Sequence, residues 1–235
     1  MGLLGDVLDV VYPPLCLSCD APLPGAQWFC ATCELSAQQL PAEGCAVCSE
    51  PGQHVSGWCE RCRGRARAFE RAYAPFVHDG AVAKAIHRFK YEDKPELSRP
   101  LAAMLLANAR AFIAESKGLL VPVPLHQKRY RERKYDHAML LAVELGKLAG
   151  RRVPDAALVR VIDTPRQVGL SDEERVKNVR GAFTAEAEVA GQEVLLLDDV
   201  LTTGATAHAA ATVLLEAGAV KVRVLSLARA VLRNT

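Results

Sequence analysis

Residues 194–206 of this chain read VLLLDDVLTTGAT, and this stretch decides the fold. The run 194–197 is continuously apolar, which is typical of a parallel strand buried on both faces. Small residues and a glycine follow at 202–206, where backbone N–H groups at the start of the next helix favour an anion such as phosphate. Asp198 and Asp199 cannot bind phosphate themselves, so we expect them to face hydroxyl groups or a divalent cation. A phosphorylated sugar carries both features.

The same stretch resembles the 5-phosphoribosyl 1-pyrophosphate (PRPP) binding motif of type I phosphoribosyltransferases, and every position fits that motif. The alternative interpretation is a buried strand and turn with incidental acids. Two adjacent carboxylates at a strand end are costly to retain without a ligand or a cation, and this cost favours the motif.

The amino-acid composition is that of an ordinary globular protein. Its 235 residues allow one good-sized core and a small accessory module, and the net charge of +2 indicates no strongly charged partner. No apolar run reaches the ~18 residues of a membrane span. Residues 1–14 lack the basic start of a secretory signal, so we expect a cytoplasmic protein. Their apolar spacing predicts a short amphipathic helix docked on the body, with membrane association as the less favoured alternative because Asp6 and Asp9 lie on its other face.

All eight cysteines fall in the first 62 residues, in four Cys-x-x-Cys pairs. Each pair offers two thiolates, and two pairs complete a tetrahedral zinc site. The segment has too few aliphatic residues for a hydrophobic core of its own, so it needs a cross-link such as a bound metal ion to fold. We therefore predict two structural Zn2+ ions with sequential pairing, although the spacing leaves a cross-braced arrangement open. The preferred ligand sets are Cys16, Cys19, Cys30 and Cys33, then Cys45, Cys48, Cys59 and Cys62.

Other uses of these cysteines are less favoured. Disulfides require an oxidising compartment, and four regular copies suit a scaffold better than a redox catalyst. His54 lies between the last two pairs and is expected to be an exposed loop residue rather than a substitute ligand. A basic linker follows, with Arg63, Arg65, Arg67 and Arg71. We expect a zinc-knuckle domain over residues 1–66 and a second domain over residues 67–235.

Helical patterns are predicted over residues 80–91, about 98–116, 136–149 with Asp136 as cap, and the stretch ending near 216. Apolar strands are predicted over residues 119–123, 158–162, 194–197 and 220–227. This alternation predicts a parallel α/β sheet, whose ligand site lies beyond the carboxyl ends of the strands. Residues 163–181 are expected to form a mobile loop and a short helix, with a plain surface loop as the alternative.

The order of motifs resembles the ComF family, which includes the GntX-type proteins. PVPLH (residues 122–126) precedes a basic run KRYRERK (128–134), and the PRPP motif follows further on. TPRQVGLS (164–171) and NVRGAF (178–183) are also similar to segments of that family. The resemblance covers nearly the whole chain. It implies a type I phosphoribosyltransferase-like parallel sheet flanked by helices, preceded by a double zinc-knuckle module.

The resemblance also implies roles for single residues. Asp198 and Asp199 would take the ribose hydroxyls, in part through Mg2+, while Lys128, Arg129 and Arg131 would face the pyrophosphate. The 5-phosphate would be held by Thr202, Thr203, Gly204, Ala205 and Thr206. The chemistry would be phosphoribosyl transfer with release of pyrophosphate. For the basic run, the alternative is a solvated helix entry.

Two places depart from the family pattern. KYDH (134–137) replaces a common Gly-aromatic-Asn-Gln stretch, and Arg166 stands where a second proline is common. Both lie near the expected pyrophosphate and acceptor side of the site, so the acceptor specificity stays open. His126, His137 and His208 receive no catalytic role from the sequence.

The family is linked to import of single-stranded DNA in naturally competent bacteria, which implies competence proteins and single-stranded DNA as partners. A non-catalytic DNA-binding adaptor is the alternative to an enzyme, because the basic linker and the run 128–134, with Tyr130 and Tyr135, offer charge and stacking. A PRPP-sensing regulator without turnover ranks last, since nothing resembles a helix-turn-helix domain.

Overall fold

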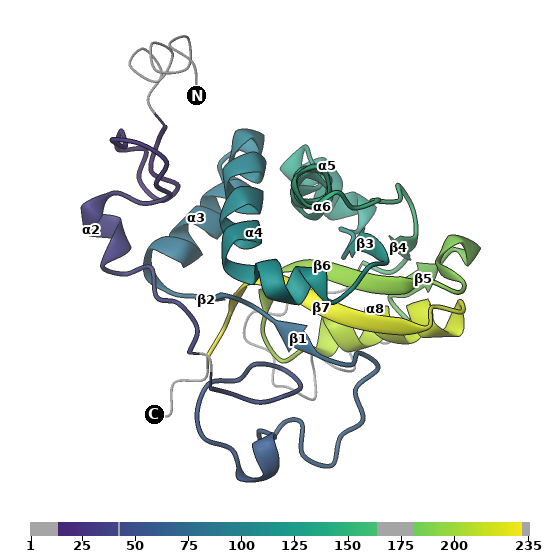
Figure 1. Ribbon diagram of the computed structural model, residues 1–235. Helices are drawn as coiled ribbons and strands as arrows, with labels where there is room; N and C mark the ends of the chain where they lie inside the picture. The colour runs from purple at the N-terminus through teal and green to yellow at the C-terminus, as the bar shows by residue number, and fades with distance from the viewer. Residues whose placement is uncertain (1–13, 42, 164–180, 232–235) are drawn as a thin grey trace.

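The computed structural model describes residues 14–41, 43–163 and 181–231 (Figure 1). The amphipathic helix predicted near the N-terminus and the loop motif at 164–171 lie outside these residues. The side chains of Val55, Arg129 and Arg133 are also outside the described part.

One parallel sheet of five strands forms the centre of the molecule, in the order β1-β7-β6-β3 with β2 also pairing with β7. Its strands are β1 (Ala72–Tyr73), β2 (Phe76–Val77), β3 (Leu119–Pro122), β6 (Glu193–Leu201) and β7 (Lys221–Arg229). A separate antiparallel pair consists of β4 (Leu158–Arg160) and β5 (Phe183–Ala185). The helices are α2 (Ala31–Glu34), α3 (Gly80–Tyr91), α4 (Ser98–Ala114), α5 (Gln127–Arg133), α6 (His137–Ala149) and α8 (Ala205–Glu216), with short 3-10 turns at Val55–Gly57, Pro95–Leu97 and Ala187–Val189.

The two faces of the sheet have separate cores. Side chains alternate along a strand, so Leu195 and Leu197 of β6 pack with α3, α4 and α6, whereas Val194 and Leu196 pack with α8. Figure 1 shows α3, α4 and α6 over one face and α8 against the other. The predicted parallel sheet flanked by helices is confirmed.

Several predicted boundaries are confirmed and others are wrong. The strand predicted over 158–162 ends at Arg160, and it pairs antiparallel with β5 instead of joining the parallel sheet. Helix α3 spans the predicted residues, and Asp136 caps α6 by accepting a hydrogen bond from the Met139 amide at 3.0 Å. The strand predicted over 194–197 continues to Leu201, because the backbone goes on pairing with β7 beyond the acids. Asp198 and Asp199 therefore lie within β6, near its carboxyl end.

The cysteine pairs form two modules on opposite sides of the sheet (Figure 1). We call residues 16–33 the first ribbon and residues 45–62 the second ribbon. The first ribbon contributes Cys16, Leu17, Leu23 and Phe29 to the core on the α3 side. Val47 of the second ribbon packs against the core on the α8 side.

Among the described residues, no helix has both the length and the apolar character needed to cross a membrane. The cytoplasmic location stays a prediction.

Candidate functional site

Two clusters of four cysteines have the geometry of tetrahedral zinc sites. In each cluster the sulfur atoms all lie within 4.8 Å of one another, and the sets are those predicted by sequential pairing. The Sγ atoms of Cys19 and Cys30 are 3.7 Å apart, and those of Cys48 and Cys59 are 3.6 Å apart. Zn–S bonds of about 2.3 Å give a tetrahedral edge of about 3.8 Å, so the donor set fits Zn2+. All eight cysteines are described, and none forms a disulfide.

Besides its packing in the core, the first ribbon makes polar contacts with one arginine of α3. Arg88 donates a hydrogen bond to the Leu17 carbonyl at 2.8 Å and forms an ion pair with Asp20. Lys94 lies 2.5 Å from the same carboxylate. These two cations lower the pKa of Asp20 to about 2.

The second ribbon is attached to the central sheet by a buried ion pair. Arg229, at the end of β7, donates to Glu50 at 3.0 Å and to the Cys48 carbonyl at 2.7 Å. The Ala72 amide of β1 also donates to the Val47 carbonyl at 2.7 Å. The ribbon is therefore joined directly to two strands of the sheet.

Asp198 and Asp199 lie near the carboxyl end of β6. Helix α3 ends and helix α6 begins beside them. Asp199 is 7% exposed, and its Oδ2 atom is 2.8 Å from Lys90 Nζ and 2.5 Å from His137 Nε2. Lys90 is in the last turn of α3, and His137 is the first residue of α6. Asp199 therefore holds both helices against the strand.

The pKa values of the two carboxyl groups are shifted in opposite directions. Burial raises the pKa of Asp198, and the neighbouring charge of Asp199 raises it further, to about 7. Burial also raises the pKa of Asp199, but the charge of Lys90 and the hydrogen bond from His137 outweigh burial and hold it well below its usual range. Such a pair, with one acidic and one weakly acidic carboxyl, is typical of a functional site.

The predicted phosphate-binding residues 202–206, which we call the glycine loop, lead directly from β6 into α8. Gly204 has a φ of 75°, a left-handed conformation that favours glycine, and it caps α8. The Thr203 hydroxyl accepts a hydrogen bond from the Ala205 amide at 3.2 Å. The loop and the two aspartates thus share one end of the central strand.

The predicted basic run lies at the neighbouring strand end. Lys128 in the first turn of α5 follows β3, which pairs with β6, and its ammonium is exposed and 3.5 Å from Asp163. Arg129 and Arg131 belong to the same helix, but the Arg129 side chain is outside the described part. The structure shows no contact between Lys128 and Asp198 or Asp199 in the described part of the chain.

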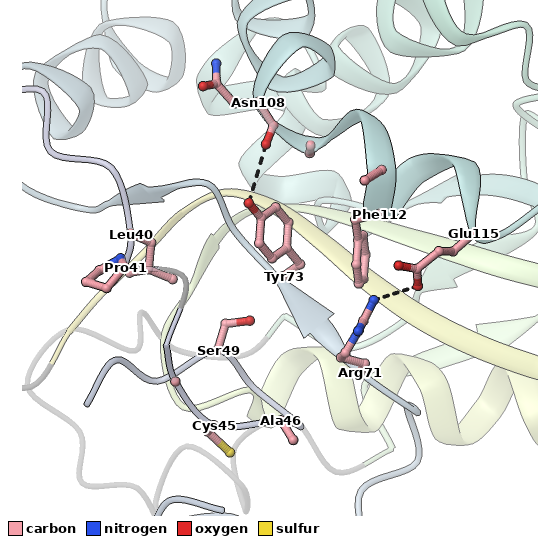
Figure 2. Close-up of a pocket in the computed structure, with 13 residues that line it drawn as sticks. Leu40, Pro41, Cys45, Ala46, Ser49, Arg71, Tyr73, Asn108, Phe112 and Glu115 are labelled. Carbon is pink, nitrogen blue, oxygen red and sulfur yellow. Dashed lines mark hydrogen bonds and ion pairs between the residues drawn. The ribbon is translucent and has the colours of Figure 1, made fainter. Parts of the chain in front are cut away.

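A hollow of about 380 Å³ lies between the second ribbon and α4 (Figure 2). Tyr73 and Phe112 stack in it with ring centroids 5.2 Å apart, and Arg71 lies over Phe112. The charge of Arg71 is balanced by Glu115 at 2.6 Å. This balance makes the hollow less suited to a phosphorylated ligand than the end of β6.

Comparison with known proteins identifies the family. The double zinc ribbon domain matches residues 7–63, and the phosphoribosyl transferase domain matches residues 141–231. DNA utilization protein YhgH of Salmonella typhimurium is 30% identical over 223 residues, which are 92% of this chain and 97% of that protein. The chain belongs to the ComF family. Competence protein F of Haemophilus influenzae is 27% identical over 92% of this chain and 96% of that protein. Competence protein ComFC of Bacillus subtilis is 26% identical over 88% of this chain and 91% of that protein.

Membership of the ComF family confirms the resemblance drawn from the motifs, and the two zinc ribbons confirm the predicted N-terminal module. The sequence did not single out Lys90 or His137 as site residues. His137 lies in the KYDH stretch that departs from the family pattern, and this departure was the one signal available. Lys90 gave no signal, because its partner lies in a distant part of the sequence.

Proposed function

We propose that this ComF protein binds PRPP together with Mg2+ at the carboxyl end of β6. One observation carries the proposal: two adjacent carboxylates and a glycine loop at a helix N-terminus lie at the same end of one central strand. The loop suits a phosphate and the carboxylates suit ribose hydroxyls, so one phosphorylated sugar spans both.

In this proposal the chain acts by positioning. The amides of the glycine loop hold the 5-phosphate, and Asp198 accepts hydrogen bonds from the ribose hydroxyls. Asp199 keeps Lys90 and His137 in place and so fixes the ends of α3 and α6 around the sugar. Lys128 and Arg129 face the pyrophosphate. Carboxylate oxygens are suitable ligands for Mg2+, which would neutralise charge on the pyrophosphate when bound.

Phosphoribosyl transfer is the reaction that such a site supports. The acceptor forms a bond to ribose C1 while the bond to pyrophosphate breaks, through a transition state with oxocarbenium character. No side chain needs to act as a nucleophile. Catalysis comes from holding the reactants in position and from balancing the charge of the leaving pyrophosphate.

The names of the relatives, DNA utilization protein and competence protein, favour a role in handling single-stranded DNA during natural transformation. A non-catalytic DNA-binding adaptor is the second candidate. Exposed Arg63 and Arg65 in the linker, and exposed Lys128 and Tyr130 in α5, favour it. Single-stranded DNA binding that falls steeply with salt, and that survives loss of both aspartates, is the result expected for an adaptor.

Calorimetric titration of PRPP with Mg2+ into the zinc-loaded protein tests the proposal. We expect saturable binding to one site and a loss of roughly 100-fold in affinity for Asp198→Asn/Asp199→Asn, because charge-assisted hydrogen bonds are removed. Asp155→Asn/Glu186→Gln removes the same charge at exposed positions and should bind like the wild type. Asp198→Asn alone keeps the Asp199 ion pairs, so it serves if the double variant unfolds. Equal affinity in the wild type and in the aspartate variants would contradict the assignment.

A further inference from the structure

The linker that leaves the second ribbon runs along the glycine loop. Arg67, a few residues after the last cysteine ligand, donates from Nη2 to the Thr203 carbonyl at 3.2 Å. The next residue, Ala68, donates its amide to Nδ1 of His208 in α8 at 3.0 Å. The linker therefore contacts both the loop and the helix that follows it.

The guanidinium group lies close to the glycine of the loop. A Cβ atom on Gly204 would be 3.8 Å from Arg67 Nη1 and 3.5 Å from Phe69 Cζ. Arg67 Nη2 also donates to the Arg61 carbonyl at 3.4 Å, whereas Nε is buried and has no hydrogen-bond partner in the described part of the chain. The group thus places a positive charge beside the N-terminus of α8, where an anion is favoured.

The bond to the Thr203 carbonyl has a directional consequence. In a trans peptide the carbonyl of one residue and the N–H of the next point in opposite directions. When Arg67 holds the Thr203 carbonyl on the linker side, the Gly204 N–H points away from the linker. A glycine peptide reverses more easily than others, since glycine occupies positive and negative φ about equally well.

We propose that Arg67 is a positioning residue of the glycine loop, and that the second ribbon is thereby part of the 5-phosphate site. This inference rests on the proposed binding of PRPP. Arg67 fixes the Thr203–Gly204 peptide in the orientation that offers its N–H to phosphate. Without Arg67 the loop divides its population between two peptide orientations, and the apparent affinity for the 5-phosphate falls with the competent fraction.

The test compares two half-ligands of PRPP. Ribose 5-phosphate reports on the glycine loop and pyrophosphate reports on the opposite end of the site, so both are titrated into zinc-loaded protein. For Arg67→Ala we expect roughly 10-fold or greater loss of ribose 5-phosphate affinity, the size of a lost charge-assisted hydrogen bond. Pyrophosphate affinity should stay within about twofold, whereas general destabilisation would weaken both ligands.

The matched control is Arg65→Ala, which removes the same charge from an exposed position in the same linker. It should bind both half-ligands like the wild type. Arg67→Met keeps most of the stem but has no donor for the Thr203 carbonyl, so it serves if the alanine variant does not fold, and the same order of losses is expected. Unchanged ribose 5-phosphate affinity in the Arg67 variants, or equal losses for both half-ligands, would overturn the inference. Failure of the wild type to bind PRPP would overturn the proposed function and this inference with it.

Discussion

The two zinc ribbons have the same ligands with the same spacing, yet they are attached to the molecule in different ways. The first ribbon pairs Arg88 with Asp20, whose side chain is 41% exposed, and its Cys19 is exposed. The second ribbon pairs Arg229 with Glu50, with side chains 1% and 11% exposed, and its four cysteines are buried. Its linker also contacts the glycine loop.

This difference indicates that the same metal motif has two roles. The first ribbon braces the outside of α3, on the face opposite α8 and away from the glycine loop. The second ribbon is continuous with the sheet and, in our proposal, with the phosphate site. Variants that remove equivalent groups from the two ribbons therefore test the comparison directly.

The largest effect is expected from loss of a zinc site. Cys45→Ser/Cys48→Ser should remove about one zinc equivalent, lower the thermal midpoint strongly and abolish PRPP binding, because structural zinc contributes on the order of 10 kcal/mol to folding of small modules. Cys16→Ser/Cys19→Ser should also lose about one zinc equivalent but keep PRPP binding. Metal analysis, thermal unfolding and calorimetry measure these outcomes. Equal loss of PRPP binding in both variants would contradict the difference in role.

A smaller effect is expected from the anchoring arginines. Arg229→Met leaves the Glu50 carboxylate buried without its partner, so the free energy of unfolding should fall by about 3–5 kcal/mol. Arg88→Met leaves Asp20 near water and still paired with Lys94, so the loss should be about 1–3 kcal/mol. Urea unfolding of both variants at neutral pH measures the losses. A larger loss for Arg88→Met would reverse the comparison.

The smallest effect is a difference in pH dependence. Burial, and then the charge of Arg67, lower the pKa of His208, whose neutral ring accepts the Ala68 amide. The stability from this contact is fully present above pH 6.5, the ordinary histidine value, and is lost as pH falls below it. The pKa of Asp20 is lowered to about 2, so the first ribbon loses its ion pairs only as pH falls from 3.8 towards about 2.

Between pH 7.5 and 5, the wild type should therefore lose more free energy of unfolding than His208→Gln, which keeps an acceptor that does not titrate. Urea unfolding at intervals across this range gives the two curves. Parallel curves would contradict the prediction, because they would show that the titration of His208 does not change the free energy of unfolding. Asp20→Asn, from the first ribbon, is the control and should follow the wild type in this range.

Most of the fold could be predicted from local sequence, because helix caps and apolar periodicity are local signals. Asp136 as the cap of α6 is an example. The length of β6 could not be predicted, since Asp198 and Asp199 suggest a strand end while the pairing that extends the strand comes from β7. The two-residue strands β1 and β2 are too short to show any periodicity.

The candidate site could be predicted in part for the same reason. The acids and the glycine loop are adjacent in sequence and form a recognisable motif. Lys90, His137 and Arg67 reach the site from distant segments, and only the fold brings them together. The basic linker was visible as a charge pattern, but its contact with the loop was not.

Hydrogen–deuterium exchange with and without PRPP and Mg2+ tests most directly whether the second ribbon belongs to the ligand site. We predict that the ligand slows exchange at residues 202–206 and at the linker residues 63–69 together, while residues 16–33 of the first ribbon exchange as before. Slowing at 202–206 without any change at 63–69, or equal slowing in both ribbons, would contradict the account.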